Sequence, residues 1–201
     1  NMEEKAENPP AEKAEEKVIN TNNNQEESNG AALAKVNDKE EEKKEEGGSE
    51  KASVNNKLVG WGYEDASGRK VDTIVIHSSY NSLGGDKYSL SKILDIYKSY
   101  GVAAHYIIDR KGSIYRLVKD EDIAYHAGES KVPDGRKGVN NFSIGIEMIA
   151  DKEEGCTKDQ YSSLKSLLAN LKDKYSIKYV LGHKDIAPGR KDDPWNFDWG
   201  K

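Results

Sequence analysis

The chain has 201 residues, enough for one domain of ordinary size and an additional segment. Its residues are 33% charged and 35% hydrophobic, which is too polar for one uniformly packed globule. Residues 1–57 hold 15 acidic and 9 basic side chains, a net charge of −6, so the total of −5 leaves +1 for residues 58–201. Neither part has the concentrated positive charge that a nucleic-acid partner requires, and we expect no nucleic-acid binding.

Residues 1–57 consist mainly of Glu, Lys, Asn, Ala and Ser and contain no aromatic side chain. Such a composition buries too little apolar surface to offset the conformational entropy of the chain. We therefore expect a disordered, charged linker over residues 1–57 and a folded domain over residues 58–201. The sequence begins at Asn1, which suggests that an upstream piece has been removed. A linker of this kind would suit a domain tethered to a membrane or wall anchor.

The folded part opens with a β-rich apolar run at residues 71–79, VDTIVIHSS, followed by a glycine-containing loop. Residues 90–101 repeat apolar side chains at helical spacing and end in a glycine, as helices often do. Residues 103–118 predict two strands joined by a turn at Lys111 and Gly112. This part of the chain is therefore expected to form a strand, a helix and a hairpin.

Residues 142–150, FSIGIEMIA, alternate large apolar side chains with Gly and Glu, which predicts another strand. Thr157 and Gln160 have the spacing of a capping box and begin an amphipathic helix that extends to about Tyr175. Residues 177–182 predict a last short strand. Strands separated by helices indicate an α/β fold with a mixed central sheet and helices packed on its faces.

All four histidines lie in the folded part, at His77, His105, His126 and His183. Taken singly, each is more often a hydrogen-bonded structural residue than a ligand. His77 and His183, however, both follow a predicted buried strand. A catalytic zinc site takes three protein ligands and keeps a fourth position for water. An acidic residue in the loop after His183 could complete such a set, and Asp185 and Asp193 are the nearest candidates, between which composition does not choose.

Five segments in order along residues 71–199 resemble the signature blocks of N-acetylmuramoyl-L-alanine amidases: TIVIHSS, AAHYIIDRKGSIYRLV, IAYHAG, NNFSIGIEMI and GHKDIAPGRKDDP. They are similar in particular to the type 2 amidases, a group that includes phage amidase lysozymes and is related to peptidoglycan recognition proteins. The resemblance does not extend to residues 1–57. It implies an amidase-like α/β fold and hydrolysis of the amide bond between N-acetylmuramic acid and L-alanine in peptidoglycan or its fragments.

The resemblance also implies one Zn²⁺ ion bound by His77, His183 and Asp193. An aspartate at the third position, where other members have cysteine, places the chain in the Asp-ligand branch. Asp185 matches a family position that is not a ligand, and we expect it to orient the loop or its histidine.

Two catalytic groups follow from the same resemblance. Glu147 is expected to act as the general base for the water that zinc activates, and Lys191 to stabilise the oxyanion. The phage lysozymes use a tyrosine at a position where this chain has Ala104, so the tyrosine route is closed here. An exposed strand position is the alternative for Glu147, and a plain solvated charge is the alternative for Lys191.

The resemblance assigns His126 to the substrate groove. Asn140 and Asn141 precede the predicted strand that carries Glu147, and we expect them to contact the peptide stem. His105 is expected to be structural. Cys156, the single cysteine, precludes an internal disulfide and has no histidine near it in sequence, so we expect an unreactive loop residue.

The expected partner is peptidoglycan, in the form of a muramyl peptide, and we expect the protein to act as a monomer. The charged leader favours an extracytoplasmic location at the cell wall or envelope, while a cytoplasmic recycling role stays open. A non-catalytic peptidoglycan-binding module on the same fold is the alternative function, and zinc hydrolysis of another amide is a weaker one. Relatives continue beyond the FDW motif into further helix, so the end at Lys201 suggests truncation.

Overall fold

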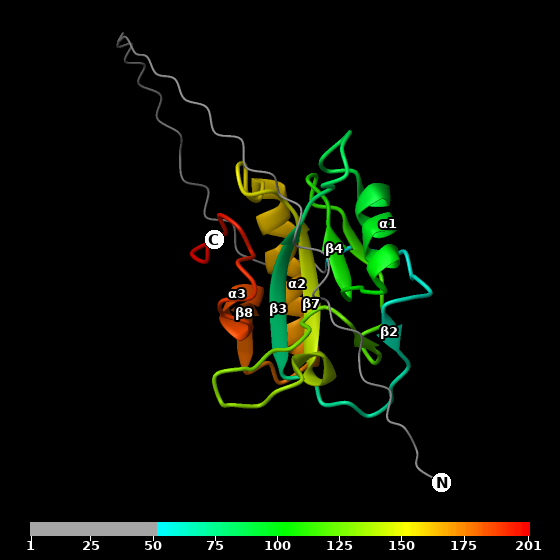
Figure 1. The fold of residues 1–201 in the computed structure, drawn as a ribbon. Coiled ribbons are helices and arrows are strands. Elements are labelled where there is room, and N and C mark those ends of the chain that lie inside the picture. The colour runs from blue at the N-terminus through cyan, green and yellow to red at the C-terminus, as the bar shows by residue number, and fades with distance from the viewer. Residues whose placement is uncertain (1–51) are drawn as a thin grey trace, which may run out of the picture. The chain divides into compact units, whose positions relative to one another are not determined.

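The computed structural model describes residues 52–201, whose main feature is a six-stranded mixed sheet in the order β1-β5-β4-β7-β3-β8 (Figure 1). Its strands are β1 (Val54–Asn56), β3 (Thr73–Ser79), β4 (Tyr106–Ile108), β5 (Ile114–Arg116), β7 (Ser143–Ile149) and β8 (Tyr179–Gly182). β4 and β5 are antiparallel, and the other neighbouring strands are parallel.

Two further strands form a separate antiparallel pair, β2 (Tyr63–Glu64) with β6 (Ile123–Ala124). The helices are α1 (Leu90–Tyr100), the 3-10 helix η2 (Val139–Phe142), α2 (Lys158–Lys174) and α3 (His183–Ile186). The predicted mixed α/β sheet with helices on its faces is therefore confirmed. None of the helices in residues 52–201 combines the length and apolarity that crossing a membrane requires.

The sheet begins earlier in the chain than the sequence predicted. β1 pairs with β5, and the amide of Lys57 donates to the carbonyl of Arg116 at 2.9 Å. The predicted boundary after residue 57 is therefore corrected, since residues 54–56 belong to the folded domain. A three-residue strand with two asparagines is held by backbone hydrogen bonds and has no apolar pattern that could reveal it. The rest of the predicted linker, residues 1–51, lies outside the described residues.

The capping box of α2 is present as predicted. Thr157 Oγ1 accepts from the Gln160 amide at 3.1 Å, and Gln160 Oε1 accepts from the Thr157 amide at 2.9 Å. Gln160 Nε2 also donates to the carbonyls of Ile108 and Ile149, both at 3.0 Å. The residue that caps the helix therefore also attaches it to β4 and β7.

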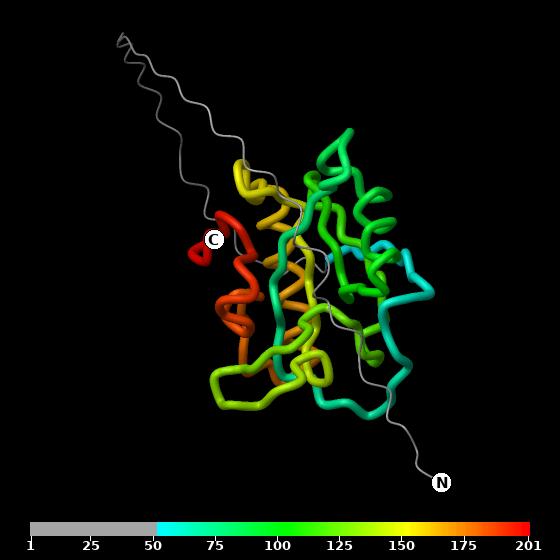
Figure 2. The backbone as a smooth tube through the Cα atoms, in the orientation of Figure 1, coloured from blue at the N-terminus to red at the C-terminus, as the bar shows by residue number. Residues whose placement is uncertain are grey.

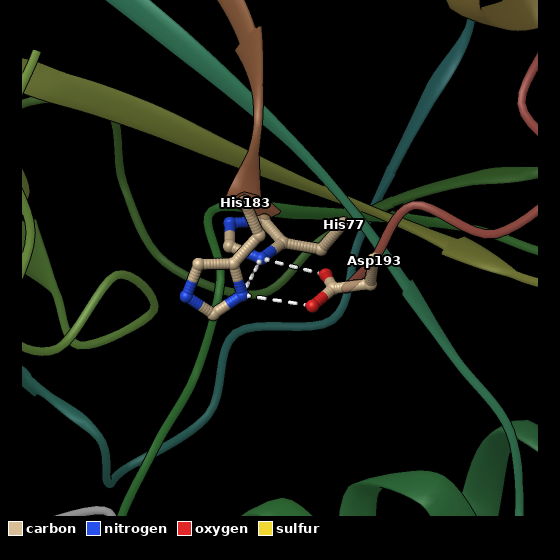
Figure 3. Close-up of side chains that lie close together, drawn as sticks. All are labelled: His77, His183 and Asp193. Carbon is tan, nitrogen blue, oxygen red and sulfur yellow. Dashed lines mark hydrogen bonds and ion pairs between the residues drawn. The ribbon is translucent and has the colours of Figure 1, made fainter. Parts of the chain in front are cut away.

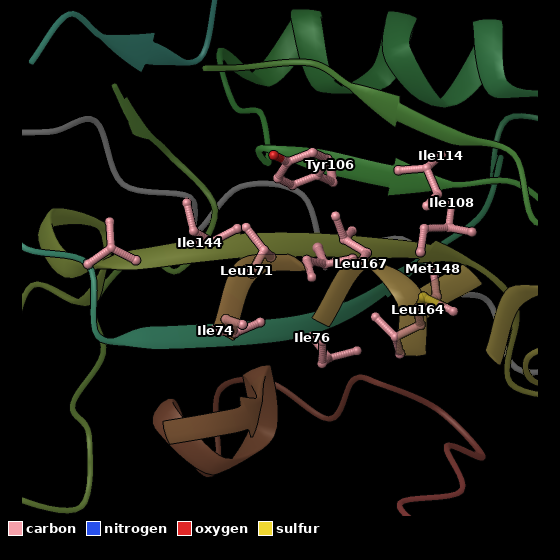
Figure 4. Close-up of a cluster of buried hydrophobic side chains, with 12 residues drawn as sticks. Ile74, Ile76, Tyr106, Ile108, Ile114, Ile144, Met148, Leu164, Leu167 and Leu171 are labelled. Carbon is pink, nitrogen blue, oxygen red and sulfur yellow. The ribbon is translucent and has the colours of Figure 1, made fainter. Parts of the chain in front are cut away.

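One face of the sheet packs against α2 and forms the main core (Figure 4). Because side chains alternate along a strand, every second residue of β3 and β7 points to this face. Full burial of such an aliphatic side chain stabilises the fold by about 1.5–3 kcal/mol. The face is formed by Ile74, Ile76, Ile144, Ile146 and Met148, and α2 contributes Leu164, Leu167 and Leu171.

The opposite face of the sheet receives the other residues of β3 and β7. Val75 and His77 on β3 are paired with Gly145 and Glu147 on β7. α1 covers the part of this face nearest β4, where Tyr97 and its neighbours pack on the sheet. The remaining part carries polar side chains and is bordered by loops, so the polar residues singled out in the sequence meet here.

The long loop after β6 borders this face on the side of β8, as the path of the backbone shows (Figure 2). The amide of Lys131 in this loop donates to the carbonyl of Ile186 at 2.8 Å. Ala127 and Val132 from the loop share a small apolar cluster with Val75 of β3 and Ile186 of α3. The loop is thereby attached to β3 and α3, which carry the predicted metal ligands His77 and His183.

Candidate active site

Three residues that are distant in sequence meet at one edge of the sheet. His77 lies on β3, and His183 is the first residue of α3, directly after β8. β3 and β8 are neighbouring parallel strands, so their carboxyl ends lie at the same edge. Asp193, in the loop after α3, reaches the same place, and one ligand atom from each of the three buried side chains lies within 4.8 Å of the other two.

The three side chains point toward one another (Figure 3). His77 Nδ1 is 3.0 Å from His183 Nδ1 and 3.4 Å from Asp193 Oδ2, and His183 Nδ1 is 3.1 Å from Asp193 Oδ1. Ligand atoms around a tetrahedral zinc ion lie about 3.3 Å apart, given bond lengths of about 2.0–2.2 Å. The spacing of these two nitrogens and one carboxylate therefore fits a zinc ion.

The hydrogen bonding of His183 supports the same conclusion. Its Nε2 lies 3.2 Å from the Ala127 carbonyl oxygen, which can only accept, so Nε2 carries the proton. In the neutral ring Nδ1 then presents a lone pair toward His77 Nδ1 and the Asp193 carboxylate. Electron-pair donors that converge in this way are stabilised by a cation placed between them.

The pKa of His77 is lowered to about 4, mainly by burial and also by the nearby His183, while Asp193 acts in the opposite direction. His77 is therefore neutral at pH 7, the form in which imidazole binds a metal.

Asp185, the other acidic candidate, does not belong to this cluster. Its Oδ2 accepts from the amide of Gly182 at 2.7 Å, at the point where β8 ends and α3 begins. This bond agrees with the expectation that Asp185 orients the segment that carries His183.

Glu147 lies beside the cluster on the neighbouring strand, paired with His77 across β7 and β3. Its Oε2 is shielded from solvent and has no hydrogen-bond partner. The pKa of this carboxyl is raised to about 8, mainly by burial and also by the charge of Asp193, while hydrogen bonds from Ser79 and Tyr97 act in the opposite direction. A shielded carboxylate with a high pKa next to a metal site has the properties of a general base.

Lys191 lies two residues before Asp193 in the loop after α3, and its amide donates to the Ala187 carbonyl at 3.0 Å. Burial has the largest effect on the pKa of both His77 and Glu147, and the charge of Lys191 lowers both values. Its ammonium group therefore acts on the metal ligands and on the carboxylate. The catalytic roles of Glu147 and Lys191 stay predictions.

The three predicted substrate contacts lie in different surroundings. Asn140 uses its Oδ1 to accept from the amides of His126 and Ala127, at 3.2 and 2.9 Å, and so supports the loop after β6. Asn141 is exposed, and His126 is half-buried next to His77. Substrate binding by His126, Asn140 and Asn141 stays a prediction.

His105 is buried and structural, as predicted. Its Nδ1 accepts from the amide of Gly145 at 3.0 Å, and its Nε2 lies 3.1 Å from the Asp122 carbonyl oxygen. Cys156 packs against the main core, where burial raises the pKa of its thiol to about 11, in agreement with an unreactive residue.

Two polar residues next to Glu147 were missed in the sequence. Ser79 Oγ lies 2.6 Å from Tyr97 Oη, and both groups hydrogen-bond to Glu147. Ser79 could have been found, because it lies two residues after His77 and so shares its face of β3. Tyr97 could not, because its spacing is that of a helix residue that packs on the core.

Known proteins resemble this chain in both sequence and fold. The sequence model of the family described as N-acetylmuramoyl-L-alanine amidase matches residues 67–196. The 1,6-anhydro-N-acetylmuramyl-L-alanine amidase AmpD of Haemophilus influenzae is 41% identical over 102 residues, which cover 49% of this chain and 55% of that protein. The chain thus spans about half the length of the curated relatives it matches.

Solved structures agree with the sequence match. The crystal structure of a selenomethionine derivative of AmpD has a TM-score of 0.61 at 28% identity and covers 75% of this chain and 93% of its own. The Escherichia coli amidase AmiD, in complex with anhydro-N-acetylmuramic acid-L-Ala-D-gamma-Glu-L-Lys, has a TM-score of 0.54 at 29% identity, covering 64% of this chain and 54% of its own. With the fold, the donor cluster and a match over residues 67–196 in agreement, this chain belongs to the N-acetylmuramoyl-L-alanine amidase family.

Proposed function

We propose that this protein is a zinc-dependent amidase that cleaves the bond between N-acetylmuramic acid and L-alanine in muramyl peptides. The observation that carries the proposal is the convergence of His77, His183 and Asp193 beside the shielded carboxylate of Glu147. A metal site alone could be structural, whereas a neighbouring carboxylate without a hydrogen-bond partner for Oε2 indicates a chemical role.

The relatives support the substrate class. AmpD is named as an amidase of 1,6-anhydro-N-acetylmuramyl-L-alanine, and AmiD was solved with an anhydromuramyl tripeptide described as its substrate. We extend this chemistry to the present chain, with peptidoglycan fragments as the first substrates to test and the polymeric wall as the second. The wall-facing location, the tether and the monomeric state stay predictions.

In this mechanism His77, His183 and Asp193 would hold the zinc ion. When bound, zinc would polarise the scissile carbonyl and lower the pKa of a water molecule. Glu147 takes a proton from the attacking water and returns it to the leaving amine of L-alanine. Lys191 stabilises the negative charge that develops on the carbonyl oxygen.

The test is mass spectrometry of an anhydromuramyl peptide and of purified wall after incubation with the protein. The expected products are free stem peptide and the peptide-free sugar, with activity lost in the His77→Ala variant and after chelation. Cleavage at another bond, or full activity after complete zinc removal, would refute the proposal. Tight binding of the peptide without cleavage would instead support the non-catalytic binding module.

A further inference from the structure

Behind the metal ligand His77 lies a chain of hydrogen bonds that none of the proposed catalytic steps uses. His77 Nε2 is 2.9 Å from His126 Nδ1, and His126 Nε2 is 3.1 Å from Ser143 Oγ. Ser143 Oγ in turn donates to the Val139 carbonyl at 2.7 Å. This series of hydrogen bonds connects the predicted metal site to the junction of η2 and β7.

The last acceptor in this series, the Val139 carbonyl, determines the donor and the acceptor of every hydrogen bond in it. A carbonyl oxygen can only accept, so the Ser143 hydroxyl proton points to Val139 and its oxygen accepts from His126 Nε2. In a neutral His126 ring, Nδ1 is then the acceptor for the proton on His77 Nε2. His77 Nδ1 is left with a lone pair, and it is this atom that faces His183 and Asp193.

The ring of His126 is also held in place from other sides. A Cβ at Gly145 would lie 2.5 Å from His126 Cγ, so the ring packs directly on the backbone of β7. The amide of His126 donates to Asn140 Oδ1 at 3.2 Å. The rings of His126 and His77 meet edge to face, with their centroids 5.1 Å apart. His126 is thus fixed by packing as well as by its hydrogen bonds.

We propose that His126 is a positioning residue that, through Ser143, holds His77 in the tautomer that binds the metal. The proposal rests on the proposed zinc site. It adds a role to His126 beyond the expected substrate contact. Mutation of a residue that hydrogen-bonds to a metal-binding histidine typically lowers metal affinity by about 10- to 100-fold, because such a residue fixes both the proton and the orientation of the ligand ring.

The first measurement is zinc affinity, by competition with a chromogenic chelator. His126→Phe removes the acceptor for His77 Nε2, and we expect zinc affinity to fall by about 10- to 100-fold. His126→Gln offers an amide oxygen in its place and should restore part of the loss. Ser143→Ala keeps the His126 ring but no longer fixes which of its nitrogens carries the proton. We therefore expect a smaller loss of zinc affinity than in His126→Phe.

The second measurement is ¹⁵N NMR of the imidazole rings in the metal-free protein, which reports the tautomers directly. We expect His77 to carry its proton on Nε2 in the wild-type protein and to lose this preference in Ser143→Ala. This measurement also tests the proposal if His126→Phe fails to fold. A proton on Nδ1 of His77 in the wild-type protein would overturn it.

His105→Gln is the matched control, because His105 is a second buried imidazole that contacts His126, with ring centroids 5.8 Å apart, and has no bond to His77. We expect it to keep its zinc affinity. An equal loss in the control, or unchanged affinity in a folded His126→Phe variant, would refute the proposal. Either result leaves the amidase function standing if the wild-type protein binds zinc and cleaves its substrate, whereas a wild-type protein without zinc affinity refutes the function itself.

Discussion

His77 on β3 and Glu147 on β7 are paired across two parallel strands, so the imidazole and the carboxylate leave the same face of the sheet. The separation between them is therefore determined by the spacing of neighbouring strands, about 4.8 Å. A ligand and a base fixed in this way need no loop closure to find each other.

Glu147→Gln should lower amidase activity by about 10²- to 10⁴-fold, the usual range for the loss of general acid–base catalysis. Zinc affinity should not change, because Glu147 is outside the donor cluster. Steady-state kinetics on an anhydromuramyl peptide and zinc competition measure the two effects. The control is Glu153→Gln at an exposed carboxylate, for which wild-type activity is expected. Near-normal activity in Glu147→Gln would remove the residue from the mechanism.

Glu147 should also make the metal-free protein less stable as pH rises. Its pKa is 4.5 as an ordinary carboxyl and about 8 in the folded protein, mainly because of burial. Between these values the folded state binds more protons than the unfolded state, so the free energy of unfolding falls as pH rises. His77 has the opposite effect on the free energy of unfolding, because its pKa is lowered from 6.5 to about 4. Its contribution rises with pH between these two values and is constant above about pH 6.5.

Urea unfolding with a chelator present, from pH 5 to pH 9, measures this effect. Glu147→Gln should be more stable than the wild-type protein at pH 8, and the difference should shrink toward pH 5. A difference that does not depend on pH would contradict the raised pKa of Glu147.

Tyr97→Phe should reduce kcat by about 2- to 10-fold, the value of one hydrogen bond, and leave KM and zinc affinity unchanged. Tyr97 Oη lies 2.6 Å from Ser79 Oγ, and both groups hydrogen-bond to the carboxylate of Glu147. Since the bond from Tyr97 opposes the effect of burial on the pKa of Glu147, its loss should move the acidic limb of the pH–rate profile to higher pH. The control is Tyr100→Phe, which removes an exposed hydroxyl from the same helix. An unshifted profile in Tyr97→Phe would argue against the positioning of Glu147 by this pair.

Asp120→Ala should lower the free energy of unfolding by about 2 kcal/mol and leave zinc affinity unchanged. Asp120 is buried, accepts from the hydroxyls of Tyr106 and Tyr175, and forms an ion pair with Lys174 at 2.8 Å. Burial alone would raise the pKa of Asp120, but the hydrogen bonds from Lys174 and Tyr106 hold it below its usual value.

The stabilisation by Asp120 is therefore complete above about pH 4 and is lost as pH falls through the lowered pKa. Thermal unfolding at pH 7 and at pH 3 checks both statements, with the exposed Asp95→Ala as the control. The loss of stability in Asp120→Ala should be smaller at pH 3 than at pH 7. An equal loss at both pH values would contradict stabilisation by the ionised carboxylate of Asp120.

Gly145→Ala should weaken zinc binding and lower stability, because the added Cβ would lie 2.5 Å from His126 Cγ and displace the ring that contacts His77. Overpacking of this kind typically costs about 1–3 kcal/mol. Gly60→Ala is the control, since a Cβ at that position would meet no atom within 4 Å. Calorimetry and zinc competition on both variants make the comparison. Unchanged zinc affinity in Gly145→Ala would show that the ring can move without disturbing His77.

Elements with an apolar pattern could be predicted from the sequence, including the short strands β4, β5 and β8, whereas the mostly polar β1 could not. β3 follows from its continuous β-rich apolar run, β7 from its alternation and α2 from its helical spacing. The capping box at Thr157 marks the start of α2 correctly. β1 is three residues long and mostly polar, and it exists because β5 offers backbone partners distant in sequence. Such a strand depends on tertiary contacts that local patterns do not contain.

The candidate site likewise has some features that the sequence indicated and others that only the folded structure shows. Histidines at strand ends pointed to a metal site, but the choice of Asp193 over Asp185 came from family resemblance, and the structure supports it through the hydrogen bond of Asp185 to Gly182. The link from His77 through His126 to Ser143 joins residues from β3, a loop and β7. No sequence spacing could reveal such a link, because the three residues meet only after the sheet has formed.

β3, the strand that carries His77, lies between β7 and β8 in the sheet. Strands enclosed in this way exchange their amide hydrogens only when the whole domain opens. Heating should therefore keep the His77 imidazole in place until the cooperative transition itself.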